Sequence, residues 1–118
     1  MKKIGEQRLI DMVRVHDIFG DDQASIQEFF QSYVDSTKVL LTDIESAIKN
    51  EDEKLAKTSF LRLKGISGNS GVMLIYQLSH KAEERVVKKD WEEVQNLFRD
   101  IETAFTKLKE RLVEHSLL

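Results

Sequence analysis

Residues 26–48 read IQEFFQSYVDSTKVLLTDIESAI, and apolar side chains recur along this stretch in steps of three and four for about six turns. The stripe consists of Ile26, Phe29, Phe30, Tyr33, Thr37, Leu40, Leu41, Ile44 and Ile48. This spacing places the side chains on one face of an α-helix. The stretch therefore predicts a long amphipathic helix that packs through that face.

The same periodicity continues on both sides of this helix. Upstream, a shorter predicted helix carries Leu9, Met12, Val13 and Phe19 and ends at Gly20. Downstream, three further stripes consist of Ala56, Phe60, Leu63 and Ile66, of Ile75, Leu78, Ala82 and Val86, and of Val94, Leu97, Phe98, Ile101, Phe105, Leu108 and Leu112. Capping residues precede three of these helices, at Asp21 or Asp22 with Ser25 as an alternative, at Asn50, and at Asp90.

Glycine and proline usage supports a helical protein. The chain has no proline and only five glycines in 118 residues, whereas β-proteins collect both residues in their turns. The connections between the predicted helices are short, so neighbouring helices should be antiparallel. We expect one all-α domain over residues 1–118, an up-down antiparallel four-helix bundle with an additional N-terminal covering helix.

Composition argues against several classes of function. Eighteen Lys and Arg against 21 Asp and Glu give a net charge of −3, without the basic excess typical of a nucleic-acid-binding protein. The chain has no cysteine, which excludes disulfides and thiolate chemistry. It also has no apolar run long enough for membrane insertion and no secretory signal at its start, so we expect a cytoplasmic protein.

The histidines give no indication of a metal site or an enzyme. No Glu-x-x-His or His-x-x-x-His pair occurs, and such pairs supply the metal ligands of helical bundles. We expect His16 to be a partly buried packing residue, His80 to face solvent, and Trp91 to pack at a helix start. No metal, cofactor or catalytic residue is expected.

Residues 58–72, TSFLRLKGISGNSGV, hold three of the five glycines within seven residues. If Leu63 faces the core, Leu61 lies about 160° away on the helical wheel and belongs to an outward strip. The strip consists of Thr58, Leu61, Gly65 and Gly68, with Arg62 and Lys64 flanking it. Glycine inside a helix costs about 0.5–1 kcal/mol relative to alanine. We interpret the strip as a docking face on which a partner approaches the backbone; the alternative is a helix end with one stray surface leucine.

Residues 61–72 resemble the signature of histidine phosphotransfer (HPt) domains, His-x-Leu-Lys-Gly-x-Ser-x-x-x-Gly-Ala. Leu63, Lys64, Gly65, Ser67 and Gly71 match it in register. The resemblance extends to the run from Phe29 to Ala47, and to Leu78, Glu83, Asp90 and Trp91. It implies a four-helix bundle with an extra helix. It also implies that Gly65 makes room for an incoming receiver domain and that Lys64 lies at the interface.

One position departs from the family pattern. The phosphoaccepting histidine of the family aligns with Leu61, and leucine has no nitrogen that could accept a phosphoryl group. The leading hypothesis is an HPt-like module that binds a response-regulator receiver domain without carrying phosphate. In it, Leu61 is an apolar anchor, while Arg62 and Lys64 face the acidic pocket of the receiver.

Two alternatives remain open. In the first, the chain is a phosphorelay protein that works between a sensor histidine kinase and a regulator, and Leu61 replaces the acceptor histidine of the parent sequence. In the second, the chain is a structural helical-bundle interaction domain.

Overall fold

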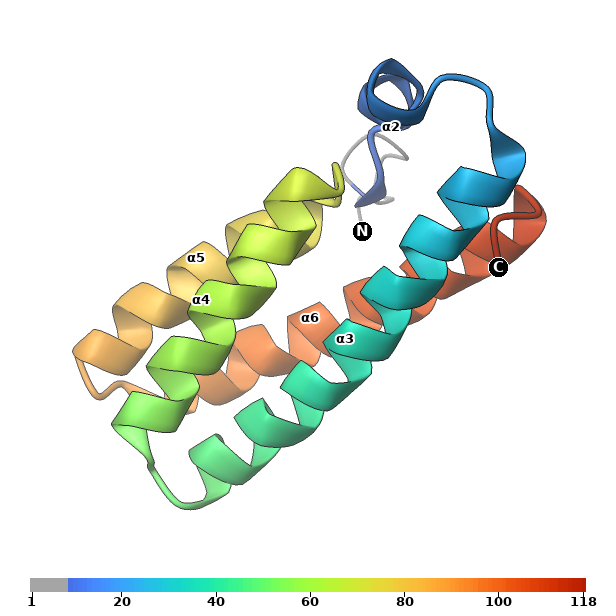
Figure 1. Cartoon of the computed structure of the whole chain (residues 1–118). Coiled ribbons are helices and arrows are strands. Elements are labelled where there is room, and N and C mark those ends of the chain that lie inside the picture. Colours follow the sequence, from blue (N-terminus) through green and yellow to red (C-terminus); the bar gives the residue numbers. More distant parts are fainter. Residues whose placement is uncertain (1–8) are drawn as a thin grey trace, which may run out of the picture.

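The computed structural model describes residues 9–118, which form five helices and no strand. The helices are α2 (Met12–Phe19), α3 (Gln23–Lys49), α4 (Glu53–Asn69), α5 (Met73–Val87) and α6 (Trp91–Glu114) (Figure 1). This confirms the predicted all-α class. Each apolar stripe predicted between residues 26 and 112 lies within one of the four long helices, α3 to α6.

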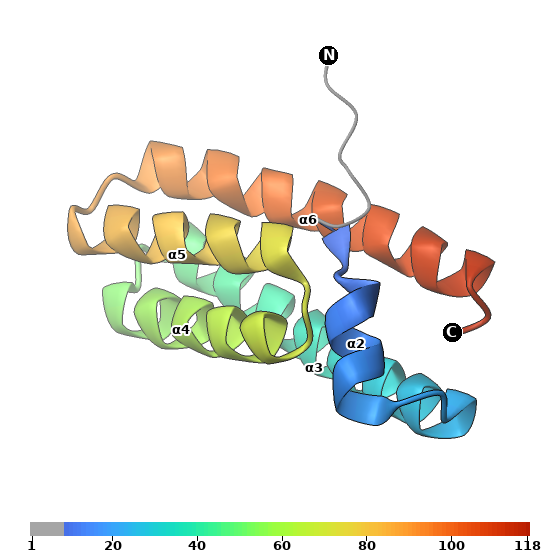
Figure 2. The same cartoon turned by 90° about the horizontal axis from the view of Figure 1, so that it is seen from above.

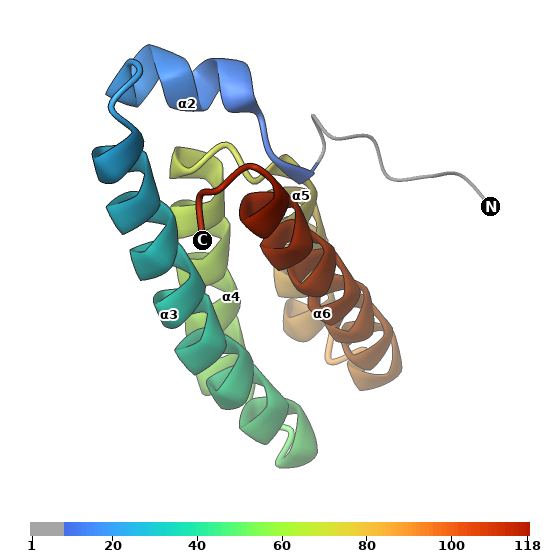
Figure 3. The ribbon, with the colours of Figure 1, turned by 90° about the vertical axis from the view of Figure 1, so that its right-hand side faces the viewer.

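The four long helices lie side by side. Neighbours in sequence pack against each other, and α6 also contacts α3. Figures 1 and 2 show the chain reversing direction at each of the short connections between α3 and α6. In Figure 3, α2 crosses the end at which α4 passes into α5. A hydrogen bond ties α2 to that turn, since the N–H of Asp11 donates to the carbonyl of Gly71 at 2.8 Å.

Aspartate side chains begin three of the long helices. Asp22, Asp52 and Asp90 accept hydrogen bonds from backbone N–H groups of the first turns of α3, α4 and α6. These bonds satisfy donors that have no partner inside the helix. Asp22 and Asp90 were among the predicted caps. The hydrogen bonds to Ser25 also hold the pKa of the Asp22 carboxyl below its usual value.

The predicted cap at Asn50 was wrong. Asn50 ends α3, and both its backbone N–H and its side-chain amide donate to the carbonyl of Ser46. Glu51 then adopts a left-handed backbone conformation with φ 48°, which turns the chain and leaves Asp52 to cap α4. The run of polar residues was recognised correctly as a boundary, but its first member closes the earlier helix.

Two expectations for the first helix were also wrong. Val13 is exposed, and Ile10 and Val15 are buried in its place, whereas Leu9, Met12 and Phe19 lie in or against the core as predicted. His16 does not pack in the core, because its side chain is 49% exposed and Nδ1 lies 3.0 Å from the carbonyl oxygen of Gly20. The reason is that α2 crosses the end of the bundle and does not run alongside it (Figure 3), so the packing at that end decides which of its side chains are buried. The predicted stripes of α3 to α6 lie in or against the core, which also includes Val34, Val72 and Leu74. Trp91 is partly buried at the start of α6, as expected.

Candidate functional site

The helix α4 continues through both glycines and ends at Asn69. Its inner face is closed, since Ala56, Phe60 and Leu63 are each 0% exposed. Its outer face is open: Leu61 is 49% exposed, and Thr58, Arg62 and Gly65 are exposed as well. The helical wheel therefore predicted the direction of Thr58, Leu61 and Gly65 correctly, whereas Gly68, the fourth residue of the strip, is only partly exposed. Residues 61 and 63, two positions apart, have opposite environments.

The two glycines of the strip differ in what surrounds them. A Cβ atom built on Gly65 meets nothing within 4 Å, so the backbone there is bare. A Cβ built on Gly68 would lie 3.1 Å from the ring of Tyr76 on α5. The ring of Tyr76, which is 36% exposed, therefore occupies the space that a side chain at position 68 would need. Of the two positions, Gly65 is the one that leaves room for another molecule.

Lys64 connects the strip to α5. Its Nζ lies 2.8 Å from Oε2 of Glu83, and the two side chains are 21% and 19% exposed. Sequence reasoning placed Lys64 beside the strip but missed this partner. The helical wheel gives only the direction of a side chain around its own helix. The pairing of Lys64 with Glu83 depends also on how α5 is rotated against α4. Arg62 lies on the other side of α4, is exposed, and pairs with no acidic group among residues 9–118.

The charge of α4 is unlike that of the whole chain. The helix carries four cations, Lys54, Lys57, Arg62 and Lys64, and one acidic residue, Glu53, which gives it a net charge of +3. The entire chain has a net charge of −3. An acidic surface is therefore attracted to α4 more than to the other described helices, whose net charges are zero or negative.

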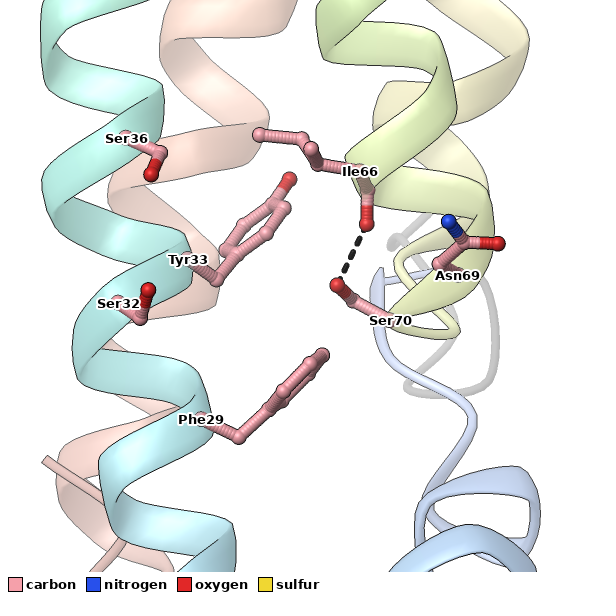
Figure 4. A pocket seen from close by; sticks show the side chains of 7 residues that line it. All are labelled: Phe29, Ser32, Tyr33, Ser36, Ile66, Asn69 and Ser70. Atoms are coloured by element: carbon pink, nitrogen blue, oxygen red, sulfur yellow. Dashed lines mark hydrogen bonds between the residues drawn. The ribbon is translucent and has the colours of Figure 1, made fainter.

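A hollow of about 200 Å³ borders the strip on the side of α3. Figure 4 shows Phe29 and Tyr33 of α3 pointing toward α4, with Ile66 opposite them. Hydroxyl and amide groups complete the lining, from Ser32, Ser36, Asn69 and Ser70. The wall contains no charged residue, so the hollow offers an apolar surface with a neutral polar rim.

Tyr33 closes the inner side of this hollow. Its hydroxyl lies 2.8 Å from Oγ of the buried Ser67 on α4. Burial raises the pKa of Tyr33 to about 12, against an ordinary value of 10.0. The hydroxyl is neutral at physiological pH, and its hydrogen bond fixes α3 against α4 directly behind the outer strip.

His80 of α5 faces solvent, as expected, with Nε2 3.0 Å from Oε1 of Glu84. Among residues 9–118, no cluster of three or more His, Cys, Asp or Glu side chains could hold a metal ion. None of the described helices is long and apolar enough to cross a membrane.

A scan against protein-family models found no match to this chain, and neither did searches of curated proteins and of solved structures.

Proposed function

We propose that this chain is an HPt-like signalling module that docks a response-regulator receiver domain without carrying phosphate. The observation that carries the proposal is the bare backbone at Gly65 beside the exposed Leu61, on a helix with a net charge of +3. A surface with an apolar centre, no obstructing side chain and surrounding cations suits a partner with an acidic pocket.

The arrangement of the helices supports the same proposal. We interpret α3 to α6 as an up-down antiparallel four-helix bundle and α2 as its additional covering helix, the fold implied by the resemblance of residues 61–72. In this interpretation, Gly65 and Lys64 occupy the interface positions of the family. The module is cytoplasmic and works by binding; it is not an enzyme.

Substitution of Gly65 tests the docking face. Gly65→Gln fills the bare position with a flexible side chain, and glutamine favours a helix more than glycine does, so the fold should remain intact. We expect the affinity for a receiver domain from the same organism to fall roughly tenfold or more, as measured by calorimetric titration. Thr103→Gln, at an exposed position of α6, is the matched control and should bind like the wild type. Undiminished binding by Gly65→Gln would remove the docking face.

The exposure of Leu61 favours one second candidate, a phosphorelay protein whose histidine has been replaced. An imidazole at position 61 would reach solvent beside Gly65, because the present side chain is 49% exposed. Under this candidate, Leu61→His takes up acid-labile phosphate from a phosphorylated receiver, while the wild type does not. If Leu61→His binds the receiver and stays unlabelled, the second candidate is lost and the docking proposal stands.

A further inference from the structure

We propose that Glu83 limits the affinity of the α4 face for an acidic partner, because it holds Lys64 and adds a negative charge beside the docking strip. This inference rests on the docking function proposed above and names a residue that regulates it. Glu83 belongs to α5 and lies outside the strip itself.

The geometry places the ion pair at the edge of the docking strip. Lys64 directly precedes Gly65 and follows Leu61 by three residues, a spacing that makes side chains neighbours on a helix surface. Both side chains of the pair are about four-fifths covered, at 21% and 19% exposure. Solvent therefore reaches the pair, and a molecule seated on Leu61 and Gly65 would lie beside Lys64.

The pair changes what the strip offers to a partner. A lysine ammonium has three donors, and one of them points to Glu83 at 2.8 Å. An acidic partner must either draw Lys64 away from Glu83 or share it, and in both cases its own carboxylates approach the carboxylate of Glu83. Like charges brought together across an interface reduce affinity. Arg62 pairs with no carboxylate among the described residues. Of the two flanking cations, Arg62 should therefore attract an acidic partner more strongly than Lys64.

The opposite interpretation is that the pair only fastens α4 to α5. The two interpretations predict different signs for the changes in receiver affinity. Glu83→Gln and Lys64→Gln break the same ion pair with side chains of similar size, so a purely structural role predicts the same direction of change in receiver binding for both. Our proposal predicts opposite directions, since one variant removes a repelling charge and the other an attracting one.

The experiment titrates a receiver domain into the wild type, Glu83→Gln and Lys64→Gln at low and at high salt. We expect Glu83→Gln to bind about two- to fivefold more tightly, Lys64→Gln to bind more weakly by a similar factor, and both effects to shrink as salt screens them. Glu84→Gln is the matched control, because Glu84 neighbours Glu83 in sequence, carries the same charge and already pairs with His80. It should change affinity less than Glu83→Gln.

The outcomes separate this inference from the docking function. If the wild type binds and Glu83→Gln binds equally or more weakly, the role of Glu83 is overturned while docking stands. A tightening by Glu84→Gln as large as that by Glu83→Gln would also overturn it, since the effect would then be one of net charge. Absence of binding by the wild type and by Glu83→Gln removes both proposals. Thermal unfolding of each variant shows whether a change in binding follows from a loss of folded protein. If Glu83→Gln does not fold, Glu83→Ala removes the same charge with a residue that favours a helix, and it repeats the test.

Discussion

The inner and outer faces of α4 each carry a leucine, and the two leucines meet opposite surroundings. Leu63 is 0% exposed and Leu61 is 49% exposed, although both are leucines in one helix. Ser67 faces inward to Tyr33, while Gly65 faces outward with nothing near it. The inner face holds the bundle together, and the outer face is free for a partner. The comparison shows that residue type alone does not assign a role on this helix; position around its axis does.

The largest expected effect separates the two leucines. Leu63→Ala removes a fully buried side chain and should lower the free energy of unfolding by about 2–5 kcal/mol. Leu61→Ala should change it by no more than about 0.5 kcal/mol, as exposed substitutions do. Chemical denaturation of both variants measures the difference. Equal losses at the two positions would mean that the faces of α4 are not distinct.

The buried hydroxyl of Tyr33, hydrogen-bonded to Ser67 on the inner face of α4, predicts a loss of stability at alkaline pH. Burial raises the pKa of Tyr33 to about 12 in the folded protein, against 10.0 for an exposed tyrosine, so the unfolded chain releases this proton first. The raised pKa leaves stability unaffected below pH 10 and reduces it as pH rises from 10 toward 12, by about 2–3 kcal/mol in all. Denaturation at several alkaline pH values should show this loss in the wild type and a smaller loss in Tyr33→Phe. The same pH dependence in both would contradict the buried position of the phenol.

The smallest effect distinguishes the two glycines. Gly65→Ala adds a methyl group into open space in a helical position and should stabilise the protein by about 0.5–1 kcal/mol. Gly68→Ala should gain less or lose stability, because the added methyl group lies 3.1 Å from the ring of Tyr76 and the ring must move. Thermal unfolding of the two variants, side by side, provides the comparison. Equal gains would mean that the Tyr76 ring yields freely.

Sequence periodicity predicted the elements of this fold far better than the contacts between them. The stripe from Ile26 to Ile48 gave α3 directly, and the wheel centred on Leu63 gave the direction of Leu61. Both are properties of a single helix. Val13 and His16 of α2 were predicted incorrectly, because their burial depends on the angle at which that helix crosses the others.

In the candidate site, too, positions within one helix were predicted and contacts between helices were not. Thr58, Leu61, Arg62 and Gly65 were placed on the outer face correctly, since their positions follow from the axis of α4 alone. The ring of Tyr76 over Gly68 and the pairing of Lys64 with Glu83 were missed. Both need the rotation of α5 against α4, which no spacing within either helix contains. Two residues of opposite charge nineteen positions apart give no signal until the turn between the helices is known.

The most direct test of the account is a map of where a receiver domain binds. Backbone amide resonances of the isotope-labelled chain are followed by NMR while an unlabelled receiver domain is added. We predict that the largest shifts occur at Leu61, Gly65 and their neighbours on the outer face of α4, with the exposed face of α6 unaffected. Shifts centred on α6, or no shifts at saturating receiver, would contradict the claim that this face docks a receiver.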